Sequence, residues 1–291
     1  MPLAAMTIGE AIKQATLQLE GGSLISARVE AERIVGEALG LERADLYLYS
    51  EQELTASAQA FIAGAVAERL GGRPLQYILG HQHFRHLDFV CRENVLIPRP
   101  ETELLVEEVL AGLDDLRTLG VPLVLDIGSG TGAIALSIAH ENDVAQIVAA
   151  DVSDEAVALS RENVERHGLT DRVTVVQSDL FGGLQDYRRC VDIVVSNPPY
   201  IRTSDLESLQ GEVRREPQLA LDGGEDGLDY YRAIIEEAPA FIKPGGLLFF
   251  EIGFDQAADV VAICENSGSF KDIEVRKDYL ENDRIIKARR I

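Results

Sequence analysis

The segment Ser196-Asn197-Pro198-Pro199-Tyr200 holds the residues whose types and order most directly suggest chemistry. The side chain of Asn197 offers a carbonyl acceptor and Pro198 offers a backbone carbonyl, so together they can accept both N–H groups of a planar NH2 group. Two consecutive prolines restrict the backbone and help to hold these acceptors in place. Tyr200 offers a flat face for a planar amide or base. The plainer alternative is a proline turn that ends a strand.

This arrangement suits a nitrogen that is a poor nucleophile because its lone pair is delocalised. Acceptors on both N–H groups raise the electron density on nitrogen and orient its lone pair toward an electrophilic methyl group, which is electrostatic preorganisation. A general base is not required, because the methylated amide nitrogen is a strong acid that can lose its proton to water. The segment therefore indicates transfer of a methyl group to an amide or amine nitrogen.

A glycine-rich segment, Asp126-Ile127-Gly128-Ser129-Gly130-Thr131-Gly132, follows a short apolar run. Its glycines permit a tight turn and let a ligand lie against bare backbone at a helix N-terminus. Asp151 follows the next apolar run and can accept hydrogen bonds from ribose hydroxyls. Three interpretations stay open: a dinucleotide site, an S-adenosylmethionine site with Asp126 near the cationic amino-acid end of the cofactor, or a tight turn without a ligand.

The elements expected to position these residues are strands that alternate with helices. Continuous apolar runs predict strands, and weaker candidates follow near the C-terminus; the runs are 123–127, 147–150, 173–176, 193–195 and 247–252, then 273–275 and 285–288. Such a pattern is typical of a parallel sheet covered by helices on both faces. In that fold, ligands bind beyond the carboxyl ends of the strands, where the glycine-rich segment, Asp151 and Asn197 all fall.

The first part of the chain has a helical rather than a strand periodicity. Apolar residues recur at helical spacing in 8–19, with Thr7 as the N-cap, in 26–39 and in 55–70. In the third run we expect one apolar side, formed by Phe61, Ile62, Val66 and Leu70. We therefore predict a helical domain over residues 1–72, a connector over 73–100 that forms a β-hairpin, and a ligand-binding domain over 101–291. A helix of this last domain is expected to start at Glu101 or Thr102.

The composition excludes several classes of protein. Among 291 residues, 27 Lys and Arg oppose 49 Asp and Glu, which gives a net charge of −22 and disfavours binding to nucleic acid or anionic membranes. No apolar run is long enough to span a membrane, and residues 1–10 lack the pattern of a secretory signal. The three cysteines predict no disulfide framework, and His81, His83 and His86 lack metal-ligand spacing, so no metal is expected. A soluble, cytoplasmic protein is expected.

These residues carry a family resemblance. The glycine-rich segment, Asp151 and Asn197-Pro198-Pro199-Tyr200 resemble class I S-adenosylmethionine-dependent methyltransferases of the branch that also contains DNA adenine and RNA guanine enzymes. Three more segments narrow the resemblance to the HemK/PrmC family: residues 75–80 (LQYILG), 97–103 (IPRPETE) and 219–229 (LALDGGEDGLD). It covers nearly the whole chain. Members methylate the side-chain amide of the glutamine in the Gly-Gly-Gln motif of class I peptide chain release factors.

The resemblance implies a fold and a set of site residues. The fold is a Rossmann-like, mostly parallel seven-stranded sheet with a small helical N-terminal domain that recognises the substrate. Residues with implied roles toward S-adenosylmethionine are Asp126, Gly128, Ser129, Gly130, Thr131, Gly132, Asp151, Asp179, Leu180 and Asn197. Those toward the substrate are Asn197, Pro198, Pro199 and Tyr200, with Asn197 and Pro198 positioning the amide and Tyr200 packing on it. At position 180, some members have an aromatic residue.

Two other functions remain as alternatives. One is an amino-group methyltransferase of DNA adenine or RNA guanine, which would need a basic groove that the net charge of −22 disfavours. The other is a non-catalytic cofactor-binding scaffold. The intact segment Asn197-Pro198-Pro199-Tyr200, hereafter the tetrapeptide, argues against it. Two further segments have open roles. The acidic, glycine-rich stretch 222–229 is either a cover for the site or a surface turn, and Arg214 and Arg215 are either a solvated pair or a contact for a partner.

Overall fold

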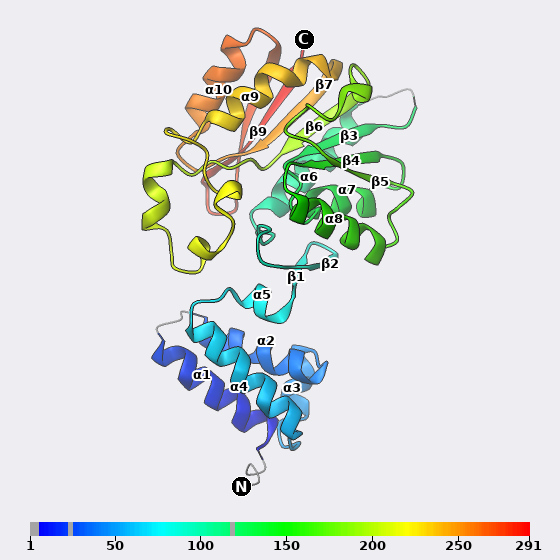
Figure 1. Ribbon diagram of the computed structural model, residues 1–291. Helices are drawn as coiled ribbons and strands as arrows, with labels where there is room; N and C mark the ends of the chain where they lie inside the picture. Colours follow the sequence, from blue (N-terminus) through cyan, green and yellow to red (C-terminus); the bar gives the residue numbers. More distant parts are fainter. Residues whose placement is uncertain (1–5, 23–25, 117–119) are drawn as a thin grey trace. The chain divides into compact units, whose positions relative to one another are not determined.

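The computed structural model describes residues 6–22, 26–116 and 120–291. Residues 1–5, which are part of the segment expected to lack a secretory signal, lie outside the described residues. The chain forms two compact units: Met1–Gly80 together with Gly211–Arg215, and His81–Gln210 together with Glu216–Ile291. The first unit is helical, and the second contains the large sheet (Figure 1). In the described parts of the chain, no helix combines the length and the apolar character needed to cross a membrane.

The helical unit is built from α1 (Ile8–Gly21), α2 (Ala27–Leu39), α3 (Arg43–Leu48), α4 (Ala56–Leu70) and α5 (Leu75–Leu79). The three longer helices match the predicted runs. Thr7 caps α1 through a capping box with Glu10, and Thr55 caps α4. Gly40 ends α2 in a left-handed conformation, at φ +63°. The buried faces of these helices form one apolar core.

The structure differs from the sequence prediction at two places in this unit. Residues 75–79, assigned to the hairpin connector, form the short helix α5, because Pro74 precedes it and Gly80 ends it at φ +83°. In α4, Ile62 and Val66 are buried, whereas Phe61 and Leu70 are 41% and 45% exposed. A step of one residue turns a helix by about 100°, so Phe61 leaves the face that Ile62 occupies.

The segment Gly211–Arg215 belongs to the helical unit although it lies far along the chain. Arg69, only 4% exposed, forms ion pairs with Glu30 and with Glu212, the latter at 2.7 Å. The guanidinium of Arg215 donates to the backbone carbonyl of Gly71. Arg214 and Arg215 are both exposed, as expected for a solvated pair, and Arg215 in addition holds the end of α4 through Gly71; a contact of either residue with a partner stays a prediction.

The second unit contains a seven-stranded sheet with the order β5-β4-β3-β6-β7-β9-β8. Its strands are β3 (Leu123–Ile127), β4 (Gln146–Asp151), β5 (Val173–Gln177), β6 (Val191–Ser196), β7 (Ile242–Glu251), β8 (Phe270–Lys277) and β9 (Asp283–Arg290). Strands β3 to β7 are parallel, and β9 pairs antiparallel with β7 and β8. The predicted seven-stranded, mostly parallel sheet is confirmed.

Helices cover both faces of this sheet. On one face lie α6 (Thr102–Asp115), α7 (Ala133–Glu141) and α8 (Asp154–Arg166), and on the other lie α9 (Asp229–Glu237) and α10 (Ala257–Asn266) (Figure 1). Successive strand residues alternate between the two cores, with Val124 in the first and Leu125 in the second. The hairpin β1 (His81–Phe84) and β2 (Leu87–Val90) packs Phe84 and Phe89 into the first core.

Candidate active site

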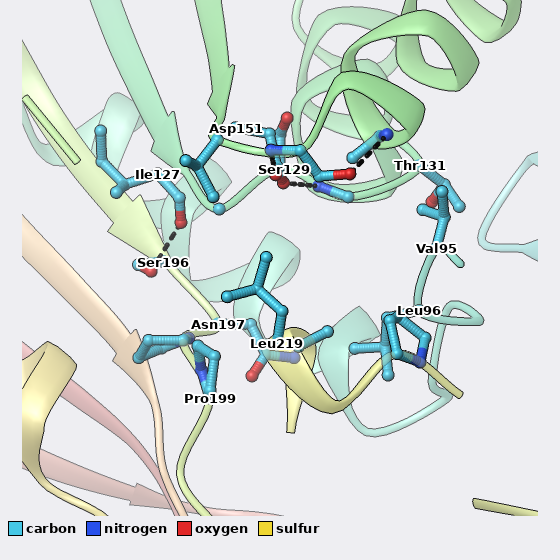
Figure 2. A pocket seen from close by; sticks show the side chains of 18 of the residues that line it. Val95, Leu96, Ile127, Ser129, Thr131, Asp151, Ser196, Asn197, Pro199 and Leu219 are labelled. Carbon is cyan, nitrogen blue, oxygen red and sulfur yellow. Dashed lines mark hydrogen bonds between the residues drawn. The ribbon is translucent and has the colours of Figure 1, made fainter. Parts of the chain in front are cut away.

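A cavity of about 530 Å³ lies at the carboxyl edge of the parallel strands. Its volume falls in the range usual for small-molecule sites. The glycine-rich segment after β3, the end of β4 and the tetrapeptide after β6 border it, and Val95 and Leu96 lie opposite Ile127 (Figure 2). Ten of the predicted site residues line it: Gly128, Ser129, Gly130, Thr131, Asp151, Asp179, Leu180, Asn197, Pro198 and Pro199.

The glycine-rich segment forms its part of the wall with bare backbone. Gly128 and Gly130 have φ values of +76° and +56°, which favour glycine, and a Cβ at either position would meet no atom within 4 Å. The amide groups of Gly128 and Ser129 both donate to the carbonyl of Ala150, which fixes the loop to β4. The loop therefore leaves open space where a side chain would otherwise stand.

Asp151 links the loop to the end of β4. Its Oδ2 accepts from the amide of Gly130 at 2.8 Å, and its Oδ1 accepts from the amide of Ser153 at 3.0 Å. Burial raises the pKa of Asp151, and these backbone donors oppose the rise. Each carboxylate oxygen keeps a second lone pair. Asp151 is thus a fixed acceptor at the cavity wall, as the ribose interpretation requires.

Two predicted cofactor residues do not line the cavity. Gly132, at φ +83°, is the N-cap of α7, and a Cβ there would lie 2.7 Å from both Leu136 Cδ1 and Ser160 Oγ, so this glycine permits close packing. Asp126 is fully buried and accepts from the amide of Ala135 at 3.2 Å. Burial raises its pKa to about 7. A direct contact of Asp126 with the cofactor stays a prediction.

Asn197 stands where β6 ends. The preceding Ser196 donates through its hydroxyl to the carbonyl of Ile127 at 2.6 Å, which ties the ends of β6 and β3 together (Figure 2). Asn197 Nδ2 donates to Thr102 Oγ1 at 3.1 Å, and Thr102 Oγ1 donates to Glu251 Oε2 at 2.6 Å. Burial raises the pKa of Glu251 to about 7, although the bond from Thr102 opposes the rise. The asparagine is therefore connected to a buried carboxyl group.

Tyr200 is not among the residues that line the cavity. It packs against the second core of the sheet, and burial raises its pKa to about 12. Its backbone carbonyl accepts from Gln256 Nε2 at 3.0 Å, and the same nitrogen donates to the carbonyl of Gly227 at 3.1 Å. Packing of the Tyr200 ring on a substrate amide stays a prediction.

The acidic segment 222–229 braces the tetrapeptide rather than covering the site. The amide of Gly223 donates to the carbonyl of Ile201, the amide of Ile201 donates to the carbonyl of Leu221, and a Cβ at Gly223 would lie 2.8 Å from the Pro199 carbonyl oxygen. A Cβ at Gly227, whose φ is +77°, would lie 2.4 Å from the Tyr200 carbonyl oxygen. The glycines of this segment therefore allow its backbone to approach the tetrapeptide closely, while Glu225 and Asp226 are exposed, as the surface-turn alternative expects.

Several residues that hold the site together were missed by sequence reasoning. Asn163 on α8 donates to the carbonyl of Thr131 and accepts from the amide of Val90, so it joins the glycine loop to the hairpin. Glu216, 6% exposed, accepts from the amide of Ile97 and from Arg99. Glu251 and Gln256 also support the site and were not identified from the sequence. Only Glu251 gave a signal, as an acid that ends an otherwise apolar strand.

The residues at the cavity fit S-adenosylmethionine. Gly128 and Gly130 offer open backbone, Asp151 offers acceptors for hydroxyl groups, and Asp179 with Leu180 lines the wall beyond β5. The hydroxyl of Ser129 is buried and has no hydrogen-bond partner among the described residues. A buried donor without a partner is costly unless a ligand satisfies it. This unsatisfied hydroxyl at the wall is consistent with a polar ligand.

Comparison with known proteins identifies the family. The family model "Methyltransferase small domain" matches residues 102–212, and "PrmC N-terminal domain" matches residues 10–80. A "Release factor glutamine methyltransferase" from Moorella thermoacetica is 41% identical over 98% of this chain and 99% of its own length. A protein of the same name from Geobacter sulfurreducens is 46% identical over 91% of this chain and 90% of its own length.

The chain belongs to the release factor glutamine methyltransferase family. The resemblance inferred from the sequence motifs is thereby confirmed. Among solved structures, the hMettl16 catalytic domain matches with a TM-score of 0.55 and 16% identity over 77% of this chain and 81% of that chain. At this identity the match shows the methyltransferase fold alone. In this chain, Leu180 lines the cavity wall. Its φ is +46°, and its carbonyl accepts a hydrogen bond from the hydroxyl of Ser178.

Proposed function

We propose that this protein transfers the methyl group of S-adenosylmethionine to the side-chain amide nitrogen of the glutamine in the Gly-Gly-Gln motif of class I peptide chain release factors. Membership of the family supports the reaction and its acceptor. The single observation in the structure that carries the proposal is the orientation of the side-chain amide of Asn197. Its Nδ2 is engaged by Thr102, so its Oδ1 is left to accept a hydrogen bond at the cavity wall.

The acceptor amide would bind between Asn197 and Pro198. The Oδ1 atom of Asn197 accepts one N–H of the substrate NH2 group, and the backbone carbonyl of Pro198 accepts the other. Both acceptors orient the nitrogen lone pair and stabilise the positive charge that develops on this nitrogen during transfer. Pro199 stiffens the backbone of the tetrapeptide. Gln256 donates to the Tyr200 carbonyl, and the backbone of residues 222–229 packs closely against Pro199 and Tyr200. The methylated nitrogen then loses a proton to water.

The cofactor supplies an electrophilic methyl group when bound. Asp151 would accept the ribose hydroxyls, the backbone of residues 128–131 would face the amino-acid part, and Asp179 and Leu180 would border the adenine. Fixed acceptors that are already held by backbone donors need little rearrangement on binding. The glycine loop and Asp151 therefore serve to bind the cofactor, whereas Asn197 and Pro198 serve to position the acceptor amide.

We assign recognition of the release factor to the helical unit, with the reaction in the cytoplasm. The match of residues 10–80 to "PrmC N-terminal domain" supports this assignment, because that match sets the chain apart from methyltransferases that share only the sheet. The net charge of −22 supports a protein acceptor rather than a nucleic acid.

A methyl-transfer assay tests the proposal. The purified protein is incubated with cofactor that carries a tritiated methyl group and, in separate reactions, with a class I release factor, the same release factor with the motif glutamine replaced by alanine, DNA and tRNA. We expect label only in the unaltered release factor, with mass spectrometry placing one methyl group on the glutamine. Label in nucleic acid but not in the release factor would support the nucleic-acid alternative, and no label in any acceptor would support the scaffold.

A further inference from the structure

A buried carboxyl group lies beside Asn197 at the end of the neighbouring strand. Strands β6 and β7 pair in parallel with Ser196 opposite Phe250, so the next residues, Asn197 and Glu251, are neighbours at the carboxyl edge of the sheet. The Glu251 residue is 2% exposed. An acid at such a site is costly to bury and calls for a specific role.

Thr102, the first residue of α6, bridges the two groups. Its hydroxyl donates to Glu251 Oε2 at 2.6 Å and accepts from Asn197 Nδ2 at 3.1 Å. A hydroxyl has a single proton to donate. Because that proton goes to the carboxylate, the hydroxyl can only accept from the asparagine, and this requirement selects nitrogen rather than oxygen of the carboxamide.

A carboxamide can turn by 180° at little steric cost, and the two orientations present opposite hydrogen-bonding groups. With Nδ2 on Thr102, the oxygen of Asn197 is free to accept from a substrate N–H. In the opposite orientation an NH2 group would face the substrate NH2 group, and the two donors would repel each other. The orientation therefore decides whether Asn197 can activate an acceptor.

We propose that Thr102 and Glu251 are positioning residues that hold the carboxamide of Asn197 with its oxygen toward the acceptor amide. This inference rests on the proposed function only for the identity of the acceptor. It adds a buried chain from Glu251 through Thr102 to Asn197, in which the carboxylate sets the direction of each hydrogen bond. Protonation of Glu251 would let this group donate to Thr102, and the direction of the chain could then reverse.

The groups around Glu251 determine how its charge responds to pH. Burial raises the pKa of Glu251 most, Thr102, Arg284 on β9 and the side chain of Asn197 itself lower it, and Glu101 beside α6 raises it. Tyr200 and Tyr231 also lie near Glu251, and Tyr231 donates to its backbone carbonyl at 2.9 Å. Arg284 is itself paired with Asp278 at 3.2 Å, so only part of its charge acts on Glu251.

The first test separates positioning from stability by kinetics. T102V removes the hydroxyl at nearly constant volume, and T102S restores it. We expect T102V to lower kcat about 10–100-fold, with KM for the release factor and the Kd for S-adenosylhomocysteine within about threefold of wild type, and T102S to recover most of the rate. Asp192→Asn, which alters a buried carboxylate at the opposite end of β6, is the matched control and should keep the wild-type rate.

A kcat for T102V within about twofold of wild type, or no recovery in T102S, would overturn the proposal. The proposed function fails separately, when wild-type protein does not methylate the release factor at all.

A second test needs no acceptor. In protein labelled with 15N-asparagine, the Asn197 side-chain NH2 signal is identified by its loss in N197D. We expect this signal to shift with pH near neutrality in wild type, and to lose that shift in E251Q and T102V. A signal that is insensitive to pH and to both substitutions would show that the chain does not govern Asn197, whatever the acceptor proves to be.

Discussion

The glycine loop after β3 and the tetrapeptide after β6 stand side by side at the same edge of the sheet, yet they are held in different ways. The glycine loop is fixed by near neighbours: its amide groups donate to Ala150 and Asp151 on the adjacent strand. The tetrapeptide is fixed by several different elements, through Thr102 of α6, Gln256 at the start of α10 and the backbone of residues 222–229. On the proposed function, the cofactor-binding loop rests mainly on one neighbouring strand, whereas the group that positions the acceptor depends on supports from several elements.

The largest effect is expected from N197A, which removes the acceptor that the tetrapeptide exists to present. We expect kcat to fall about 10²–10³-fold, because one preorganised hydrogen-bonding group is lost from the transition state. Affinity for S-adenosylhomocysteine, measured by calorimetry, should change by less than about threefold. Equal losses of turnover and affinity would instead place Asn197 on the cofactor, and the contrast between the two regions would disappear.

The converse change is D151A in the support of the glycine loop. We expect affinity for S-adenosylhomocysteine to fall about 10–100-fold, because hydrogen bonds from ligand hydroxyls to a charged acceptor are lost. At saturating cofactor, kcat should fall much less. Calorimetry and steady-state kinetics provide the two values, and D186A, an exposed acid in the same unit, is the control. Unchanged affinity in D151A would remove Asp151 from the cofactor site.

Replacing a glycine of the segment 222–229 by alanine tests whether the tetrapeptide needs the support of that segment. In G227A, the new Cβ would stand 2.4 Å from the Tyr200 carbonyl oxygen at φ +77°, so we expect a loss of about 2–4 kcal/mol in the free energy of unfolding. Turnover should fall while cofactor affinity is kept. In G130A, where open space surrounds the Cβ, the order should reverse: cofactor affinity falls, and only about 1 kcal/mol of stability is lost.

The smallest effect concerns pH and stability at Glu251. Its pKa in the folded protein, about 7, lies above its ordinary value, so its contribution to stability is largest at acidic pH and is lost as pH rises through 7. E251Q removes this loss. We expect E251Q to be more stable than wild type at pH 8 by about 1–3 kcal/mol, with the difference vanishing near pH 5, while its kcat is lower. Thermal melts at both pH values measure this; equal melting curves at pH 8 would contradict it.

The same contrast explains how much the sequence could predict. Strand β3 was predicted with its observed bounds, Leu123–Ile127, and the glycine loop followed, because local patterns encode both. The position of Asn197 at a strand end was equally local. The partnership of Thr102 with Glu251 joins residues 149 apart in sequence, and no periodicity or spacing signals such a bond.

The helical unit shows a similar limit. Its long helices followed from apolar periodicity, but α5 was missed because a five-residue helix is too short to show a period. The close approach of Gly227 to the tetrapeptide was missed for another reason: a glycine-rich acidic stretch has the composition of an exposed loop. Only the folded structure shows that these glycines let the segment pack closely against the backbone of the tetrapeptide.

The assignment of Gly211–Arg215 to the helical unit has a consequence for how the chain is connected. The polypeptide passes between the units at residues 80–81, again at 210–211 and once more at 215–216. A fragment that begins at His81 would therefore contain Gly211–Arg215 but lack Arg69, the ion-pair partner of Glu212. Along the chain, only Glu216 separates Arg215, the last residue of the helical unit's second segment, from Pro217, which lines the cavity, so the chain enters the cavity wall directly from a segment that belongs to the helical unit.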